Sequence, residues 1–570
     1  MRLWHLRPFR NIIRRMDNLL QELEIVPILL LEENVLDWQP GSITEQGSLG
    51  IGTRSDQLLV LGLPGTSAPH EKAIDNLVVQ YTELDELDEL DNLTFVMAID
   101  IRLRRRGRAG FQPSSIGPTI LFDQKGLVGT PAYLLSAKMR LFVPVKSLGL
   151  VSIRTFPYAQ QDTEHHRCID VSLWMGLEYL SRRRQARRLP LRGLRKAGGI
   201  RTVDHLGGVP GLYADEILQV IEGANLTAAQ YVNMREQGQL PRVHSRFIQS
   251  HTTTNARGIA YLLFLEALHS YLDSQFPIFL IIARFPLDTT APKDGRRDRA
   301  KQPTPHSVCV MGHIAYDTKT APDLQAIRTF KKHVGFLTTT AYLRELVVQD
   351  DDVGPLLRLP VWRRDEVKGS REDTARRVLW DESLQGNAIA FSVGLPRDIR
   401  LAYESAFARV SELIALLSYN GAGKRSAFRA GYDKALTKFG VDLSPSGFAG
   451  LFLGALDTQQ LVVGFYLEHT RRLQQHIQDM PSGAARAWLL NRNLPRFVWI
   501  AEIAIREWVE DGDEAFVVGE VYIDATQSAS LWSLLAYRLP GVLATLERRS
   551  TYVFANWPAR KSWVRSNFEG

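Results

Sequence analysis

The sequence predicts an α+β protein in which helical segments come before antiparallel strands. Apolar residues recur at helical spacing in three segments, residues 168–184, 211–226 and 255–275. Dense apolar and β-branched runs follow at residues 276–285, 306–317 and 343–355. A block of helices followed by a block of strands is typical of an α+β domain.

Length and composition limit the class of protein. With 570 residues the chain is too long for one ordinary core, which indicates about two to four domains. No apolar run is long enough to span a membrane, and the basic N-terminal segment lacks the unbroken apolar stretch of a secretory signal. Two cysteines exclude a disulfide framework and a cysteine-rich zinc site. We therefore expect a protein of the reducing cytoplasm with no membrane segment.

Four regions are distinguished along the chain. Residues 1–150 mix apolar strands with loops and predict an N-terminal accessory α/β domain. Residues 151–400 contain the helices and strands described above and predict the core. Residues 401–490 are predicted to be a helical insertion or lid. Residues 491–570 predict a helix and strands, with a hairpin near Glu510–Asp513, that complete the sheet of the core.

Cys168 is the first candidate functional residue because it begins the first helix of the core. A thiol is an effective nucleophile only as a thiolate, which a helix N-terminus and a neighbouring imidazolium both favour. The alternative is an inert role, because free cysteines are often small buried hydrophobes. Cys309 lies in the middle of a predicted strand, and we expect it to be a core residue of that inert kind.

His306 is the candidate base for this thiol. It follows Pro305 at the start of a predicted strand, from which a ring can project into a cleft. His313 is an alternative base, although strand alternation places it on the opposite side of the strand from His306.

Three consecutive aspartates at the end of the next strand can supply the group that orients the imidazole. They are Asp350, Asp351 and Asp352. If the strand extends through all three, Asp350 and Asp352 lie on one side of it and Asp351 on the other. The strand pattern therefore does not identify which of the three aspartates orients the imidazole.

The order of these residues resembles that of papain-like cysteine peptidases. The segment PHSVCVMGH around His306 is similar to the papain-type histidine strand, roughly Asn-His-Ala-Val-x-x-Val-Gly-Tyr. The segment DDDVGP resembles the Asp-Pro-x-x-Gly element of bacteriocin-leader peptidases of the same fold, and it matches Asp350 to the acid of the family. The segment QQDTEHHRC resembles the family's Gln followed by Cys. Its interval is seven residues from Gln161 and eight from Gln160, where the family usually has six.

The resemblance covers roughly residues 157–359 and implies a papain-like core. It implies a triad of Cys168, His306 and Asp350, with Asp351 as the alternative acid. An oxyanion hole would combine the backbone N–H of Cys168 with the amide of Gln161 or, alternatively, Gln160. The implied activity is cleavage of a peptide or isopeptide bond in a peptide or protein substrate, with no cofactor and no metal. A bacterial enzyme of this kind could act as a conditional effector.

Two other functions remain open from the sequence. The same triad could serve a deamidase or an acyltransferase, and a chain that kept only the fold could be an inactive scaffold or a nucleic-acid-binding protein. The basic runs IRLRRRGR, SRRRQARRLPLRGLRK and KDGRRDRAK are not interleaved with aromatic residues, so nucleic acid is not the favoured partner. Two of these runs could flank the cleft and attract an acidic partner. His165 and His166 precede Cys168, but adjacent histidines cannot easily share one metal ion, so we expect a solvated loop there.

Overall fold

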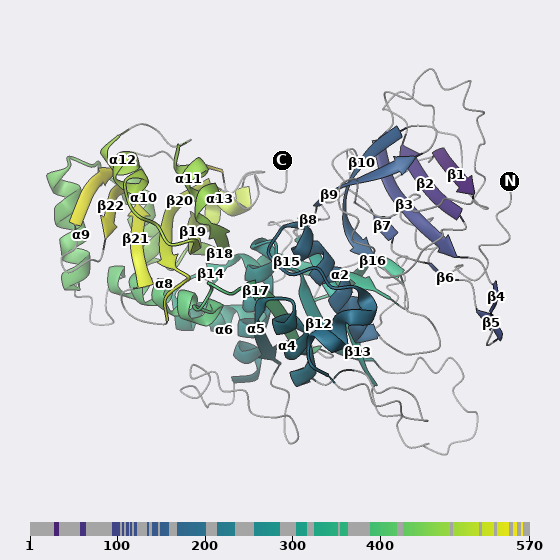
Figure 1. The fold of residues 1–570 in the computed structure, drawn as a ribbon. Helices are drawn as coiled ribbons and strands as arrows, with labels where there is room; N and C mark the ends of the chain where they lie inside the picture. Colours follow the sequence, from purple (N-terminus) through teal and green to yellow (C-terminus); the bar gives the residue numbers. More distant parts are fainter. Residues whose placement is uncertain are drawn as a thin grey trace, which may run out of the picture.

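A computed structural model describes strands between residues 28 and 158 and most of the chain from 168 to 561. The described ranges of the second part are 168–200, 212, 214–233, 256–284, 304–315, 324–351, 354–362, 388–418, 426–478, 483–511, 516–528, 533–545, 551–555 and 560–561. Figure 1 shows three larger sheets that follow one another along the molecule in chain order, coloured purple to blue, teal, and yellow-green. Helices and antiparallel sheets occur together, as the α+β prediction requires.

The first sheet is antiparallel and has the strand order β1-β2-β3-β7-β10-β9, with β6 paired to β3, while β4 and β5 form a separate hairpin. Its strands and those of the hairpin are β1 (Ile28–Glu33), β2 (Gln57–Leu63), β3 (Thr94–Arg102), β4 (Arg105–Gly107), β5 (Gly110–Gln112), β6 (Ser115–Ile116), β7 (Thr119–Leu121), β9 (Met139–Val145) and β10 (Gly149–Tyr158). The predicted strands of residues 1–150 are therefore present. The helical part of the predicted α/β domain lies outside the described residues.

The second sheet is the one that positions the candidate site. Its strand order is β11-β17-β12-β13-β15-β16, with β8 paired to β13, and every pair is antiparallel. The strands are β8 (Leu134–Leu135), β11 (Leu226–Val232), β12 (Ile278–Arg284), β13 (Thr304–Ala315), β15 (Leu343–Asp350), β16 (Gly354–Pro360) and β17 (Ala388–Pro396). The helices of this region are α2 (Cys168–Arg182), α3 (Leu194–Ala197), α4 (Ala214–Gly223), α5 (Ala256–Asp273) and α6 (Gln325–Val334). The three predicted helices and three predicted strands between residues 168 and 355 are present in the predicted order. Strand β11, between α4 and α5, and helix α6, between β13 and β15, were not predicted.

Helix α2 packs directly on the second sheet. Gly176 permits a close approach, because a Cβ at this position would lie 2.7 Å from the ring carbon Cζ of Phe279 in β12. The hydroxyl of Ser172 donates a hydrogen bond of 2.9 Å to the backbone carbonyl of Ser307 in β13, and both residues are buried. These contacts fix the start of α2, where Cys168 lies, against the strand that carries His306.

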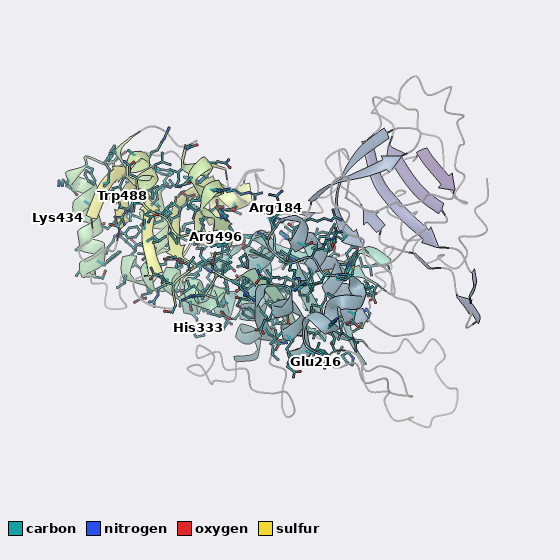
Figure 2. The ribbon with its side chains drawn as sticks, viewed as in Figure 1. Arg184, Glu216, His333, Lys434, Trp488 and Arg496 are labelled. Atoms are coloured by element: carbon teal, nitrogen blue, oxygen red, sulfur yellow. The ribbon has the colours of Figure 1, made fainter. Side chains whose placement is uncertain are left out.

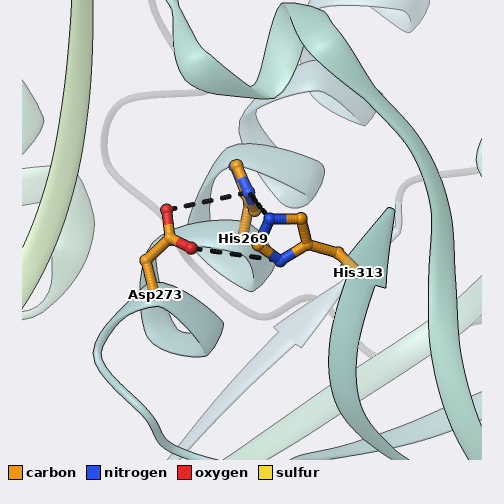
Figure 3. A group of neighbouring side chains, drawn as sticks. All are labelled: His269, Asp273 and His313. Carbon is orange, nitrogen blue, oxygen red and sulfur yellow. Dashed lines mark hydrogen bonds and ion pairs between the residues drawn. The ribbon is translucent and has the colours of Figure 1, made fainter. Parts of the chain in front are cut away.

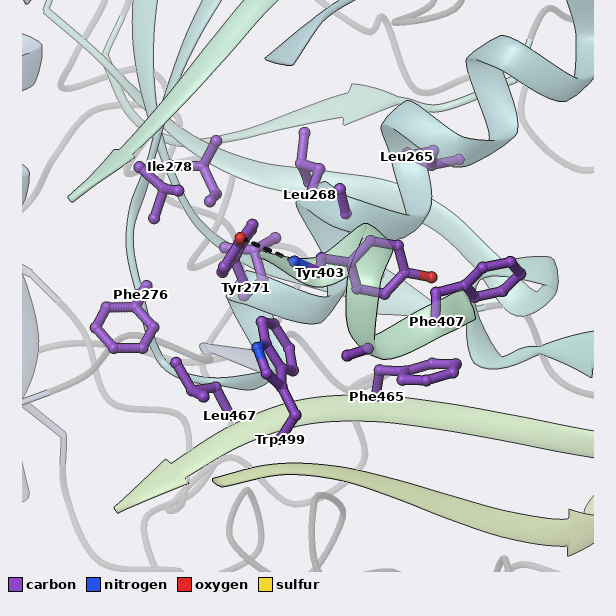
Figure 4. Close-up of a cluster of buried hydrophobic side chains, with 14 of the residues drawn as sticks. Leu265, Leu268, Tyr271, Phe276, Ile278, Tyr403, Phe407, Phe465, Leu467 and Trp499 are labelled. Carbon is purple, nitrogen blue, oxygen red and sulfur yellow. Dashed lines mark hydrogen bonds between the residues drawn. The ribbon is translucent and has the colours of Figure 1, made fainter. Parts of the chain in front are cut away.

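Helix α5 is predominantly apolar, and it also carries buried polar residues such as Glu266 and His269. It contacts the second sheet at β12 and β13 and also reaches strand β18 of the third sheet. Figure 4 shows the aromatic residues at this junction, where the ring of Tyr271 from α5 lies 5.5 Å from Trp499, measured between centroids. The indole N–H of Trp499 donates to the carbonyl of Leu401. One continuous hydrophobic core therefore extends from the second sheet into the third.

The third sheet corrects our prediction for residues 491–570. These strands do not join the sheet that contains β13 and β15. Together with β14 and β18 from earlier in the chain, they form a separate sheet. Its strand order is β14-β18-β19-β20-β21-β22-β23, and β24 pairs with β20. The strands are β14 (Leu337–Thr338), β18 (Leu461–His469), β19 (Phe497–Ile505), β20 (Phe516–Asp524), β21 (Leu534–Leu539), β22 (Gly541–Thr545), β23 (Thr551–Ala555) and β24 (Arg560–Lys561). The prediction was wrong because strand pairing is a long-range property that local hydrophobic patterns do not specify.

The region 401–490 is mostly helical, as predicted, but it also contains β18, a central strand of the third sheet. Its helices are α8 (Tyr403–Leu417), α9 (Ala427–Lys438), α10 (Phe448–Asp457), α11 (Thr470–Gln478) and α12 (Ala484–Leu490). The predicted hairpin near residue 510 is present as the antiparallel pair β19 and β20, joined through α13 (Arg506–Asp511). The 401–490 region is therefore part of a larger α/β unit rather than a separate helical insertion. Among the helices of the described ranges, none combines the length and the apolar character needed to cross a membrane.

Candidate functional site

Cys168 is the first residue of α2 and is half-buried. The first turn of this helix also contains Asp170, whose buried carboxylate is paired with Arg195 of α3 at 2.8 Å. A carboxylate in the first turn stabilises the positive end of the helix dipole. Arg195 neutralises the charge of Asp170. An unpaired carboxylate at this position would disfavour a thiolate at Cys168 more strongly.

His306 lies near the start of β13, and its ring reaches two groups from different elements. Its Nε2 atom lies 2.9 Å from Oδ2 of Asp350, the last residue of β15. The side chain of His306 is 8% exposed and that of Asp350 is fully buried. The second group is the side chain of Cys168, whose interaction with the ring raises the pKa of His306. Residues distant in the sequence are thus connected in the order Cys168, His306, Asp350.

The environment of the His306 ring favours the imidazolium. Burial lowers the pKa of His306, but the charge of Asp350, the hydrogen bonds with Asp350 and Cys168, and the charge of Asp351 together raise it to about 10. A 2.9 Å contact between nitrogen and a carboxylate oxygen is the length of a charge-assisted hydrogen bond. At neutral pH the ring is therefore positively charged and can stabilise an anion on the neighbouring sulfur atom.

Asp351 differs from the sequence prediction. Strand alternation placed it on the opposite side of the strand from Asp350, but β15 ends at Asp350 and Asp351 is the first residue of the turn. Its carboxylate is fully buried, and Oδ1 lies 3.9 Å from Nε2 of His306. Both carboxylates therefore face the same imidazole, because alternation does not continue beyond the end of a strand. The shorter distance makes Asp350 the hydrogen-bonding partner and Asp351 a second nearby charge.

His306, Asp350 and Asp351 could in principle be considered as ligands of a metal ion, since their donor atoms lie within 4.8 Å of one another. Donor atoms on a tetrahedral zinc ion are about 3.3 Å apart, as follows from zinc–nitrogen bonds of about 2.0 to 2.1 Å. The 2.9 Å separation of His306 Nε2 and Asp350 Oδ2 is shorter than this and matches a hydrogen bond. The geometry thus favours a histidine oriented by an acid.

The other predicted residues are placed as follows. Cys309 is completely buried in β13, and burial raises the pKa of its thiol far above its ordinary value, so it is the inert cysteine of the pair. His313 is turned away to His269 and Asp273 of α5. The remaining candidates, Gln160, Gln161, His165, His166 and Asp352, lie outside the described residues.

The basic run that follows α2 is divided between two places. Arg184, labelled in Figure 2, lies just beyond the end of the helix opposite to Cys168. Since a helix of 15 residues is about 22 Å long, this end does not flank the cysteine. A cavity of about 620 Å³ there is lined in part by Arg184, Arg187 and Arg397, together with Glu222. Arg195, near the end of the run, returns to the first turn of α2, where it pairs with Asp170.

Ser172 and the ion pair of Asp170 and Arg195 were not predicted from the sequence. Ser172 and Asp170 lie on α2 close to Cys168, and polar residues within an otherwise apolar helix were the available signal. Their partners could not be found from the sequence, because Arg195 and Ser307 come near α2 only through the fold.

Comparison of the chain with protein-family models, with curated proteins and with solved structures gave no match. The arrangement of Cys168, His306 and Asp350 is therefore the basis for assigning a function.

Proposed function

We propose that this protein is a cysteine-dependent hydrolase that cleaves a peptide or isopeptide bond, and that the second sheet with α2 is a papain-like core. The observation that carries the proposal is that the ring of His306 is hydrogen-bonded to Asp350 and interacts with Cys168, the first residue of a helix. A nucleophile in contact with a base that is itself oriented by an acid is the arrangement that enzymes use for nucleophilic catalysis.

In the first half of the reaction, the thiolate of Cys168 attacks the carbonyl carbon of the substrate. The carbonyl oxygen becomes an oxyanion, which the backbone N–H of Cys168 at the start of α2 is positioned to stabilise. The imidazolium of His306 then gives its proton to the leaving amine. The C–N bond breaks, and an acyl group remains joined to the sulfur as a thioester.

In the second half, the neutral His306 accepts a proton from a water molecule that attacks the thioester. The C–S bond breaks, the carboxylic acid leaves, and the pair of thiolate and imidazolium forms again. Asp350 holds the ring in one orientation and stabilises its positive charge throughout. An amine in place of water would make the enzyme an acyltransferase, and a glutamine side chain as substrate would make it a deamidase, with the same three residues in the same roles.

A peptide-like electrophile tests the proposal. The purified chain is incubated at neutral pH with a peptidyl epoxide, and the modified cysteine is identified by mass spectrometry. We expect Cys168 to be modified and Cys309 to be protected by burial. Cys168→Ala should remove the labelling, and His306→Ala should reduce its rate at pH 7 by at least about tenfold, since only about 3% of a free thiol with a pKa of 8.5 is ionised at that pH.

Cys309→Ala is the matched control, because it removes the other thiol without touching the series of three residues. It should leave labelling at the wild-type rate. Labelling of Cys168 that is unchanged in His306→Ala would contradict the dyad. Absence of labelling in a folded wild-type protein would favour the inactive scaffold, for which binding to nucleic acid that weakens steeply with salt is the positive test.

A further inference from the structure

A second group of ionisable side chains lies inside the protein, away from the proposed catalytic series. Figure 3 shows His269 and Asp273 on α5 and His313 on β13, with the three side chains facing one another between the helix and the strand. Their side chains are 5–7% exposed. The proposed hydrolase mechanism uses none of them.

The donor atoms of this group are separated by distances that suit a metal ion. Nε2 of His269 lies 3.4 Å from Nε2 of His313 and 3.7 Å from Oδ2 of Asp273. Zinc–nitrogen bonds of about 2.0 to 2.1 Å give tetrahedral donor separations of about 3.3 to 3.4 Å. The two nitrogen atoms already have this separation. The carboxylate of Asp273 lies 4.0 Å from His313, measured from Oδ1 to Nδ1, so the His313 ring and the carboxylate would both have to adjust for the three residues to bind one ion.

The hydrogen bond at Nδ1 of His269 fixes the ring so that its Nε2 faces His313 and Asp273. Nδ1 lies 3.0 Å from the hydroxyl oxygen of Thr340, and that hydroxyl donates its own proton to Glu266 at 3.0 Å. Thr340 must therefore accept from an N–H at Nδ1 of His269, which places the lone pair of the ring on Nε2. Metal-binding histidines are commonly oriented in this way, through a second ring nitrogen that donates to an oxygen atom.

Asp273 supplies the independent observation. Its carboxylate is buried, and Oδ1 accepts no hydrogen bond within the described part of the chain. A buried carboxylate oxygen without a hydrogen bond is costly, and a divalent metal ion would supply the missing partner.

We propose that His269, Asp273 and His313 bind one divalent transition-metal ion, with Zn²⁺ as the expected occupant. Two imidazoles and one carboxylate are a ligand set that zinc accepts, with the fourth position left for water or another oxygen ligand. The ion would join α5 to β13, the strand on which His306 precedes His313 by seven residues. Its role would be to hold these two elements together, and it does not depend on the proposed hydrolase activity.

The test measures metal content directly. The full-length protein is treated with EDTA, titrated with Zn²⁺ or Co²⁺, and analysed by mass spectrometry of the bound metal and by the visible spectrum of Co²⁺. We expect one equivalent of metal, a Co²⁺ spectrum with the intensity of a four-coordinate site, and a lower melting temperature after EDTA. Asp273→Asn keeps the shape of the side chain and should weaken Zn²⁺ binding by at least about 100-fold.

Two further variants make the test specific. Thr340→Val removes the hydroxyl that orients His269 and should weaken Zn²⁺ binding by about 10- to 100-fold. His306→Ala is the matched control, because His306 is a buried histidine on the same strand but belongs to the catalytic series. This variant should still bind one equivalent of metal. Less than about 0.1 equivalent in the folded wild-type protein, or equal affinity in wild type and Asp273→Asn, would overturn the proposal.

Discussion

The ion pair of His306 and Asp350 leads to a quantitative prediction for Asp350→Asn. This substitution keeps an oxygen that can accept from Nε2 but removes the negative charge. The pKa of His306 is about 10 in the folded protein, against an ordinary value of 6.5. One pKa unit corresponds to about 1.4 kcal/mol, so the difference corresponds to about 5 kcal/mol in favour of the charged ring. Since Asp351 remains 3.9 Å away, the expected loss of folding free energy at pH 6 is about 3 to 5 kcal/mol.

The pH dependence follows from the direction of the shift. Because the pKa of His306 is raised by folding, the folded state binds this proton more tightly than the unfolded state. The stabilisation is therefore fully present below about pH 6.5 and is lost as the pH rises through about 10. The difference between wild type and Asp350→Asn should be largest at pH 6 and should nearly disappear by pH 10.

Thermal unfolding of the full-length protein at pH 6, 8 and 10 measures this difference. A loss of about 3 to 5 kcal/mol should lower the melting temperature by about 4 to 6 °C at pH 6 for a cooperative unit of this size. Asp398→Asn is the control, because its partner Arg496 lies 2.6 Å away but both side chains are exposed. Such a surface pair should contribute less than about 1 kcal/mol at each pH. If the loss of stability in Asp350→Asn relative to wild type stays constant or grows from pH 6 to pH 10, that result refutes the reasoning.

Other substitutions test the packing and the buried charges. Gly176→Ala should cost about 1 to 3 kcal/mol, because the added methyl group would overlap the ring of Phe279, while Gly454→Ala in α10 meets no atom within 4 Å and should stabilise by about 0.4 to 1 kcal/mol. Thermal unfolding of the two variants should therefore shift in opposite directions. Arg538→Met should cost about 3 to 5 kcal/mol, because it leaves the fully buried carboxylate of Glu520 without its 2.8 Å partner. Adding Glu520→Gln to this variant should recover part of the lost stability. If no stability is recovered, the unpaired charge of Glu520 is not the cause of the loss.

Most elements around the candidate site could be predicted because each has a clear local pattern. Cys168 begins α2, and the strands that carry His306 and Asp350 form as the apolar runs predicted. The orientation of Asp351 could not be predicted, since it depends on the residue at which β15 ends. That end is set by the hairpin in which Asp350 pairs with Gly354, a property of two strands together.

The group formed by His269, Asp273 and His313 shows another limit. His269 and Asp273 are four residues apart on an otherwise apolar helix, so a shared face could have been inferred from the sequence. The third member, His313, was predicted as an alternative base on the side of the strand opposite to His306. That it meets α5 follows from the packing of this helix on β13, which no local pattern encodes.

The pairing of the late strands failed for the same reason. The segment of β18 has a clear β-type composition, but helices on both sides made a continuous helical region the simpler interpretation. Its membership in the third sheet depends on partners such as β19, some 30 residues later, and β14, more than 120 residues earlier. Hydrophobic periodicity therefore identified element types better than it identified sheets.

The most direct test of the central claim is the rate at which iodoacetamide alkylates Cys168 at pH 6, compared between wild type and His306→Ala. A free thiol with a pKa of 8.5 is only about 0.3% ionised at this pH, so a sulfur held as thiolate can react up to about 300-fold faster. If Cys168 and His306 form a thiolate and imidazolium pair, wild type should be alkylated at least about tenfold faster than His306→Ala at pH 6, and the two rates should converge above pH 9. Equal rates at pH 6 would contradict the account.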